Sequence, residues 1–159
     1  MQNYLNLTLK LKQDAASQAG VAQLVSTFDA KLKPTLDQVF PDSQIVHFAR
    51  FLMIGTEYLQ IITVFDGDSL DYAMFFWNKL NAVFEAAYTF VENAPSGDDW
   101  NVDNFIAFNR IPGNQPVPFY FYSAYPDKTV KIINATPAAA VSAPASAGVS
   151  APATATART

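Results

Sequence analysis

The feature that most constrains this fold is a pair of neighbouring segments whose apolar residues are not confined to one face. Residues 44–54 and 58–65 are rich in β-branched and aromatic side chains, and residues 55–57 separate them, a pattern typical of a β-hairpin. Successive side chains of a strand point to opposite faces. Because apolar residues occupy both alternations, neither face of this hairpin can be left to water, and we expect a covering layer on each.

Periodicity predicts the other elements. Residues 5–12 alternate leucine with polar residues, which is the clearest strand pattern in the sequence. Asp14 is placed to cap a first helix, and residues 66–69 supply capping oxygens for a second. Helical spacing predicts an apolar stripe on each: Val21, Leu24, Val25, Phe28 and Leu32 on the first, and Ala73, Phe76, Trp77, Leu80, Val83, Phe84, Ala87 and Phe90 on the second. The further expectations are a first helix to about residue 33 with a short continuation from Pro34 to residue 40, a turn at 41–43, a long helix over 70–92, a short helix over 102–109, a strand over 117–125 and a strand extension over 129–133.

This order of elements, β-α-β-β-α-(α)-β, matches the ferredoxin-like βαββαβ arrangement of the α+β class. It predicts a four-stranded antiparallel sheet with both long helices on a single face. A second copy of the chain is the simplest cover for the other face and would give a homodimer with two-fold symmetry. The alternative is a monomer that covers this face with its own loop over residues 93–116.

Composition changes sharply near residue 135. From there to residue 159 the chain contains only Ala, Ser, Thr, Pro, Val, one Gly and Arg158. Such a segment carries too little large apolar surface to offset the entropy of ordering it. We therefore expect an α+β domain over residues 1–134 and a flexible tail over 135–159, either passive or acting as a tether.

Charge and cysteine content exclude several classes of function. The chain has no cysteine, which rules out disulfides and cysteine-ligated metal centres. Its 10 Lys+Arg against 14 Asp+Glu leave no basic face, so we expect no nucleic-acid partner. The first residues lack the basic and apolar regions of a secretory signal, and no apolar run approaches the roughly 20 residues that span a bilayer. The expectation is a soluble, cytoplasmic protein without a membrane partner.

His47, Arg50 and Asp66 are the candidate catalytic residues. His47 is the only histidine and can serve as a general base or a haem ligand, or it can be a hydrogen-bonded core residue. Arg50 follows three residues later, on the opposite face of a regular strand unless a bulge intervenes. An arginine in apolar company needs an anion, so we expect either an ion pair with Asp66 or a clamp for an anionic ligand group.

Aromatic residues are the candidates for binding a ligand. Phe48 and Phe51 of the hairpin, with Tyr120 and Tyr122 of the last predicted strand, are expected to line a cavity for an apolar or planar molecule. The tyrosines can also simply complete an apolar wall with one polar group. Asp66 and Asp68 are compatible with a metal, but helix capping accounts for them, and we predict no metal site.

The element order and the two-faced strands resemble the dimeric α+β barrel superfamily, over about residues 2–133. Residues 64–67, Val-Phe-Asp-Gly, are similar to the end of the Gly-x-x-Asp-Gly motif of dye-decolourising peroxidases, with Thr63 in place of the first glycine. The resemblance implies an oxidoreductase, peroxidase-like or monooxygenase-like, that holds an apolar or planar ligand between helices and sheet. Haem is a conceivable cofactor, and the sequence leaves the cofactor unknown.

A second hypothesis needs no chemistry. In it the same apolar sheet face serves only to dimerise, the chain is a non-catalytic assembly or interaction subunit, and phenylalanine and tyrosine side chains fill the space where a ligand would bind.

Overall fold

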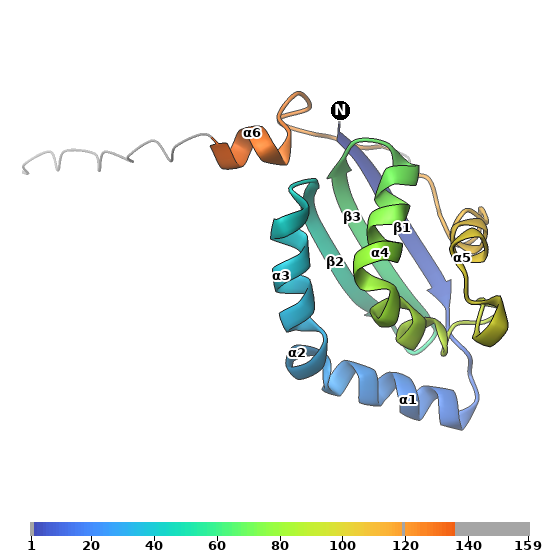
Figure 1. Cartoon of the computed structure of the whole chain (residues 1–159). Helices are drawn as coiled ribbons and strands as arrows, with labels where there is room; N and C mark the ends of the chain where they lie inside the picture. The colour runs from blue at the N-terminus through green and yellow to red at the C-terminus, as the bar shows by residue number, and fades with distance from the viewer. Residues whose placement is uncertain (1, 119, 136–159) are drawn as a thin grey trace, which may run out of the picture.

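Three antiparallel strands form the sheet of the computed structural model, which describes residues 2–118 and 120–135 (Figure 1). The strands are β1 (Gln2–Lys10), β2 (Val46–Ile54) and β3 (Tyr58–Asp66). Their order is β1-β3-β2, so β3 is the central strand and pairs with both neighbours along its whole length. The predicted α+β class and antiparallel sheet are confirmed.

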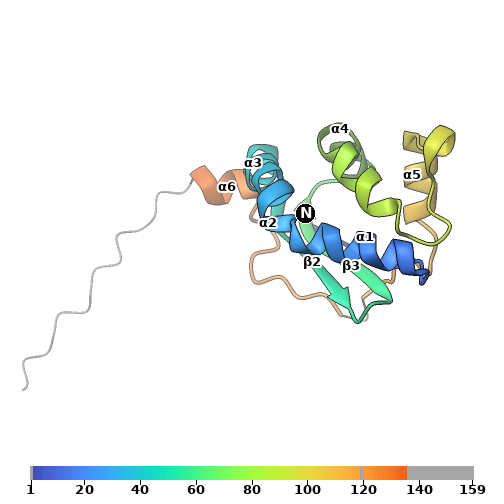
Figure 2. The same cartoon turned by 90° about the horizontal axis from the view of Figure 1, so that it is seen from below.

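Most of the helices lie on one face of this sheet, whereas the last one lies beyond its edge, as the view from below shows (Figure 2). The helices are α1 (Ala15–Ser26), α2 (Phe28–Lys31), α3 (Lys33–Ser43), α4 (Ser69–Tyr88), the 3-10 turn η1 (Gly97–Asp99), α5 (Val102–Asn109) and α6 (Val130–Ala135). Asp14 caps α1 by accepting from the Ser17 N–H, and Asp68 caps α4 by accepting from the Leu70 N–H, as predicted. The helix at 102–109 is also confirmed.

The first helical region is broken, whereas one helix to residue 33 was expected. α1 ends at Ser26, and the hydroxyl of the next residue, Thr27, donates to the Gln23 carbonyl. Leu32 then separates α2 from α3, two residues before Pro34. Proline restricts the residue that precedes it and lacks an N–H, which favours a new helix start here. The turn predicted at 41–43 is wrong, because α3 continues through Pro41 and ends at Gln44 in the left-handed region, φ 52°.

The hairpin has the predicted register over most of its length. Ile54 faces Tyr58 and Ala49 faces Thr63, so the alternation is correct from the turn to the middle of the sheet. Regular pairing outward from Ile54 and Tyr58 predicts His47 opposite Phe65, and this pair is wrong. A β-bulge between Val46 and Phe48 places Val46 opposite Phe65 and leaves His47 as the extra residue.

No fourth strand is assigned within residues 117–118 and 120–125 of the described chain, where one was predicted. Pro116 and Pro118 remove two N–H donors from this segment, which disfavours strand pairing. Other segments contact the outer side of β1 instead. The Thr8 N–H donates to the Asn114 carbonyl (2.8 Å), and Leu11, just after the strand, forms an isolated antiparallel bridge with Val91. The strand extension predicted over residues 129–133 is also wrong, because helix α6 occupies that position.

The core lies between the sheet and α4. The buried residues of α4 recur every four positions and form one stripe along the helix: Tyr72, Phe76, Leu80, Phe84 and Tyr88. They pack on the leucines of β1 and on β3, where Phe65 stacks on Tyr72 with ring centroids 3.8 Å apart. Of this stripe, Phe76, Leu80 and Phe84 were predicted on the buried side of the helix, and Tyr72 was missed.

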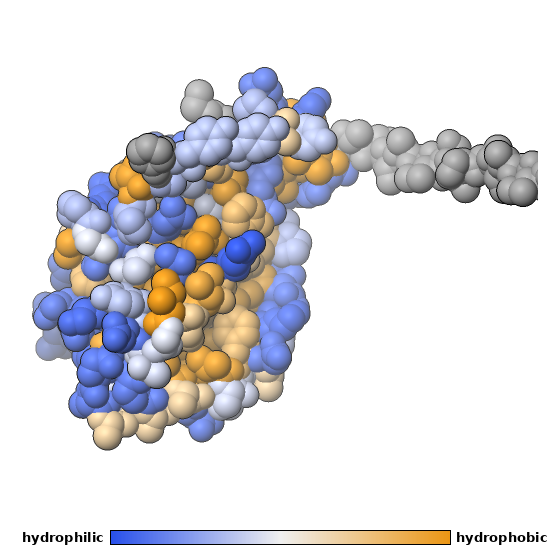
Figure 3. Space-filling view, turned by 180° about the vertical axis from the view of Figure 1, so that it is seen from behind, coloured by the Kyte–Doolittle hydropathy of each residue, from blue (hydrophilic) through white to orange (hydrophobic). Residues whose placement is uncertain are grey.

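The opposite face of the sheet, here called the helix-free face, carries a band of apolar side chains (Figure 3). Phe48 and Ile54 are each 44% exposed there, although Val64 is buried. Residues 120–125 cover one end of this face, where the rings of Tyr4 and Phe121 lie 5.5 Å apart. The predicted second layer is therefore partial in the described chain. Of the tail expected over residues 135–159, only Ala135 is described, as the last residue of α6, and residues 136–159 lie outside the described residues. Within the described ranges no helix is both long and apolar enough to cross a bilayer.

Candidate functional site

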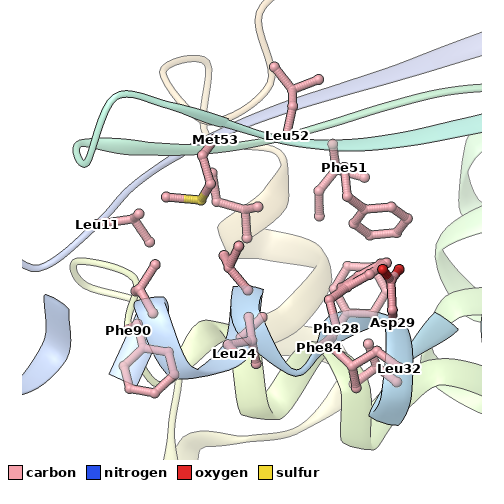
Figure 4. A pocket seen from close by; sticks show the side chains of 16 residues that line it. Leu11, Leu24, Phe28, Asp29, Leu32, Phe51, Leu52, Met53, Phe84 and Phe90 are labelled. Atoms are coloured by element: carbon pink, nitrogen blue, oxygen red, sulfur yellow. The ribbon is translucent and has the colours of Figure 1, made fainter. Parts of the chain in front are cut away.

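An apolar pocket of about 300 Å³ lies between the α1–α2 region, α4 and the sheet. Its wall is formed by Leu11, Val21, Leu24, Val25, Phe28, Asp29, Leu32, Phe51, Leu52, Met53, Leu59, Ile61, Val83, Phe84, Ala87 and Phe90. Met53 and Phe51 reach down from the sheet toward Leu24 and Phe28 on the helices, while the Leu52 side chain points away (Figure 4). This set of residues is called the apolar pocket below.

The wall of the apolar pocket is positioned by the helical spacing of its residues and by one glycine. Val21, Leu24 and Phe28 are three and four residues apart, so they share the face of α1–α2 that meets the sheet. At Gly20 a Cβ atom would lie 2.2 Å from Cε1 of Phe90, so only glycine lets α1 approach the Phe90 ring this closely. The far end of α1 has no such contact, and Val25 is 51% exposed.

Asp29 is the only ionisable residue in the wall of the apolar pocket. Its carboxylate points from the helix toward the sheet, in the direction of Phe51 (Figure 4). Within the described chain no hydrogen bond or ion pair engages this side chain, and the nearby Lys33 binds Asp37 instead. The pocket can therefore hold an apolar group, with one carboxylate at its exposed side.

His47 and Asp66 form a second arrangement, at the other end of β2. His47 Nε2 lies 3.0 Å from Asp66 Oδ1, and the two side chains are 13% and 10% exposed. The other oxygen, Oδ2, accepts from the Val130 N–H (2.7 Å) and so fixes the start of α6. The bulge at His47 is what allows this pair, and a more open cavity of about 360 Å³ lies beside it.

Arg50 is not part of this arrangement, and the predicted ion pair with Asp66 is wrong. Arg50 lies opposite Ile62 on the helix-free face, and Asp66 is four residues further along β3. At about 3.3 Å per residue that is about 13 Å, beyond the reach of the two side chains. In the described part of the chain Arg50 makes no ion pair and no side-chain hydrogen bond, and it is exposed to solvent. The anion-clamp role stays a prediction.

The four aromatic residues predicted to bind a ligand are separated. Phe51 belongs to the wall of the apolar pocket. Phe48 lines the cavity beside His47, while Tyr120 and Tyr122 are 76% and 71% exposed and lie outside both cavities. Sequence reasoning missed Asp29, whereas the spacing of Val21, Leu24 and Phe28 had indicated an inward-facing stripe and Phe90 was expected on the buried side of its helix.

Haem does not fit the residues present. Its usual protein ligand would be His47, the only histidine, whose Nε2 is already engaged by Asp66. His47 is also absent from the wall of the apolar pocket. Among the described residues no group of three or more His, Asp or Glu side chains is placed to hold a metal ion.

Two buried tyrosines on α4 differ in how their hydroxyls are paired. The Tyr88 hydroxyl donates to Asn109 Oδ1 (2.6 Å), and burial raises the pKa of Tyr88 above its ordinary value of 10.0. Burial likewise raises the pKa of Tyr72. The neighbouring Thr63 hydroxyl offsets this increase only in part. The Tyr72 and Thr63 hydroxyls do not reach hydrogen-bond geometry with each other or with any other group of the described chain, so both are buried and unsatisfied.

Comparisons with known proteins identify no family for this chain, because no family model, no curated protein and no solved structure matches it. The geometry described above is therefore the basis for the proposals that follow.

Proposed function

We propose that this chain is a small-molecule-binding domain whose ligand is an apolar compound held in the apolar pocket. The observation that carries the proposal is a concave space of about 300 Å³ whose wall is apolar at every position except Asp29. Pockets for small molecules span roughly 300–1,000 Å³ and are mostly apolar with few polar groups. This pocket is at the small end of that range, which favours a compact ligand or a single alkyl chain.

Packing supports the same interpretation. Protein interiors are normally filled to the density of organic crystals. Here Leu24, Met53 and Phe84 surround open space although the chain has ample large side chains to fill it. A ligand that occupied the pocket would bury this apolar surface, and each Å² removed from water contributes about 25 cal/mol.

The resemblance to the dimeric α+β barrel superfamily, with a ferredoxin-like order of strands, remains part of this proposal. A ligand between helices and sheet is what that resemblance implies, and the apolar pocket lies between them. The oxidoreductase activity remains a prediction without a residue in the pocket to carry it, because His47, Arg50 and Asp66 all lie outside its wall. The proposal is therefore limited to binding.

A fluorescence titration tests it. N-phenyl-1-naphthylamine, a neutral dye that brightens in apolar surroundings, is added to the purified full chain and then displaced with 1-decanol. Leu24→Trp fills the pocket from α1, and Leu70→Trp makes the same change at an exposed position of α4 outside the wall.

We expect the dye to bind the unmodified chain and the Leu70→Trp variant alike, and decanol to compete with it. Leu24→Trp should weaken dye binding at least tenfold while the melting temperature changes little. Equal binding to both variants would place the dye elsewhere and refute the proposed site.

Assembly through the helix-free face is the second candidate function, favoured by the 44% exposure of both Phe48 and Ile54. A second copy would remove these side chains from water. Arg50 opposes this arrangement, because it lies between Phe48 and Leu52 on the same face and has no carboxylate partner in the described chain. Burying it without one would be strongly unfavourable.

Sedimentation velocity separates the two candidates. An assembly subunit sediments as a dimer, and Phe48→Asp converts it to a monomer while dye binding is unchanged. A chain that is monomeric at high micromolar concentration, before and after the substitution, contradicts the assembly function.

A further inference from the structure

We infer that the ligand of the apolar pocket carries a positively charged head group on its apolar body, as an alkylammonium compound does. This inference rests on the proposed binding function and adds the chemical class of the ligand. It follows from the charge at the exposed side of the pocket, which is separate from the apolar character of the wall.

The first step is the position of Asp29. Its carboxylate points from the helix toward the sheet, in the direction of Phe51, at the end of the pocket where an apolar chain lying along Leu24 and Met53 would finish (Figure 4). The residue is exposed, so the carboxylate stays hydrated when the pocket is empty. A head group at this point would meet the carboxylate directly.

The second step is the lack of any competing charge in the wall. No Lys, Arg or His lines the pocket, so nothing there attracts an anionic head group. Lys33 attracts Asp29 electrostatically, but its ammonium group is paired with Asp37, and neither Lys33 nor Lys31 belongs to the wall. Asp29 is therefore available to a ligand cation and repels a carboxylate or phosphate.

The third step weighs the size of the effect. Ion pairs at exposed positions contribute about 0.2–1 kcal/mol, and salt screens them. Converted at 1.4 kcal/mol per factor of ten, the upper part of this range is a two- to fivefold preference. The alkyl part supplies most of the affinity, and Asp29 selects among head groups.

Three probes with the same ten-carbon chain test this: decylammonium, 1-decanol and decanoate, each used to displace the neutral dye at neutral pH and low ionic strength. We expect decylammonium to bind about two- to fivefold more tightly than decanol, and decanoate to bind most weakly. Raising the salt concentration should shrink both differences.

Variants separate the local carboxylate from the overall negative charge of the chain. Asp29→Asn should abolish the preference for decylammonium over decanol, and Asp29→Lys should reverse it toward decanoate. Asp103→Asn, at an exposed position in the first turn of α5, removes the same charge away from the pocket and should leave the preference intact.

The possible failures are distinct. Decanol binding with no head-group preference, or a preference that survives Asp29→Asn, overturns this inference and leaves the binding function standing. Failure of all three probes to displace the dye overturns the binding function and the inference together.

Discussion

The two halves of the helix-covered face of the sheet are built from similar residues and packed differently. Around α4 and α5 the aromatic rings interlock: Phe105 lies within 6 Å, centroid to centroid, of Trp77, Phe84 and Tyr88. Around α1 and α2 the side chains leave a space of about 300 Å³. The difference shows that open space here does not come from a shortage of large apolar residues but from where α1 and α2 are placed above the sheet.

Leu80→Ala should produce the largest loss of stability, because it removes a fully buried side chain from the packed half. Leu80 is 1% exposed and touches the core on the inner side of α4. Buried leucine truncations lower the free energy of unfolding by about 2–5 kcal/mol. Urea denaturation followed by circular dichroism measures this change. A loss below about 1 kcal/mol would show that the packed half is looser than described.

Alkaline pH should also act on the packed half. Burial raises the pKa of both Tyr72 and Tyr88 above the ordinary 10.0, so each neutral phenol stabilises the folded state fully below pH 10. Above pH 10 the free energy of unfolding falls, because the phenols ionise more readily in the unfolded chain. Each of the two tyrosines contributes a loss of about 1.4 kcal/mol for every further pH unit. Between pH 9 and pH 11 we expect a loss of about 3 kcal/mol for the pair in urea titrations. The Tyr72→Phe, Tyr88→Phe double variant should lose markedly less, and an unchanged pH profile would contradict the assignment.

Tyr88→Phe should lower the free energy of unfolding by about 1–3 kcal/mol, because it leaves the Asn109 amide oxygen buried without its donor. Tyr72→Phe is the matched control within the same helix. It removes a hydroxyl that has no partner, so stability should stay the same or rise by up to about 1 kcal/mol. Equal losses in the two variants would mean that the Tyr72 hydroxyl is satisfied in solution.

The smallest effect is expected from Leu24→Ala in the pocket half. This side chain already borders open space, so its removal creates little new cavity, and we expect a loss under about 1 kcal/mol. The same chemical change at Leu80 gives the scale for comparison. A loss at Leu24 as large as that at Leu80 would indicate that the pocket is closed by packing in solution.

Much of the sheet could be predicted from the sequence, because alternation and a glycine turn fix register locally. The pairs from Ile54 with Tyr58 to Ala49 with Thr63 follow from that alternation and from the turn at residues 55–57. The bulge at His47 could not be predicted, since it depends on Asp66 and on the Val130 N–H, far along the chain. The bulge explains why His47 pairs with Asp66, whereas the failure of the predicted Arg50–Asp66 pair follows from the register itself, which sets Arg50 opposite Ile62, four residues from Asp66.

The apolar pocket was only half predictable. The spacing of Val21, Leu24 and Phe28 indicated an apolar stripe facing the sheet, but a stripe does not tell whether the space beneath it is filled. That depends on the height of α1 above the sheet, which the contact of Gly20 with Phe90 sets across 70 residues of sequence. The fourth strand was expected from the aromatic composition of residues 117–125, and the two prolines beside it outweighed that signal in the described residues.

A crystal structure of the protein under xenon pressure tests the central claim most directly, because xenon enters apolar cavities without needing a polar partner. The account predicts a xenon site between Leu24, Met53 and Phe84, beneath α1 and α2, in the unmodified chain and none in the Leu24→Trp variant. A structure in which α1 has settled onto the sheet, with these side chains in contact and no xenon between them, would contradict it.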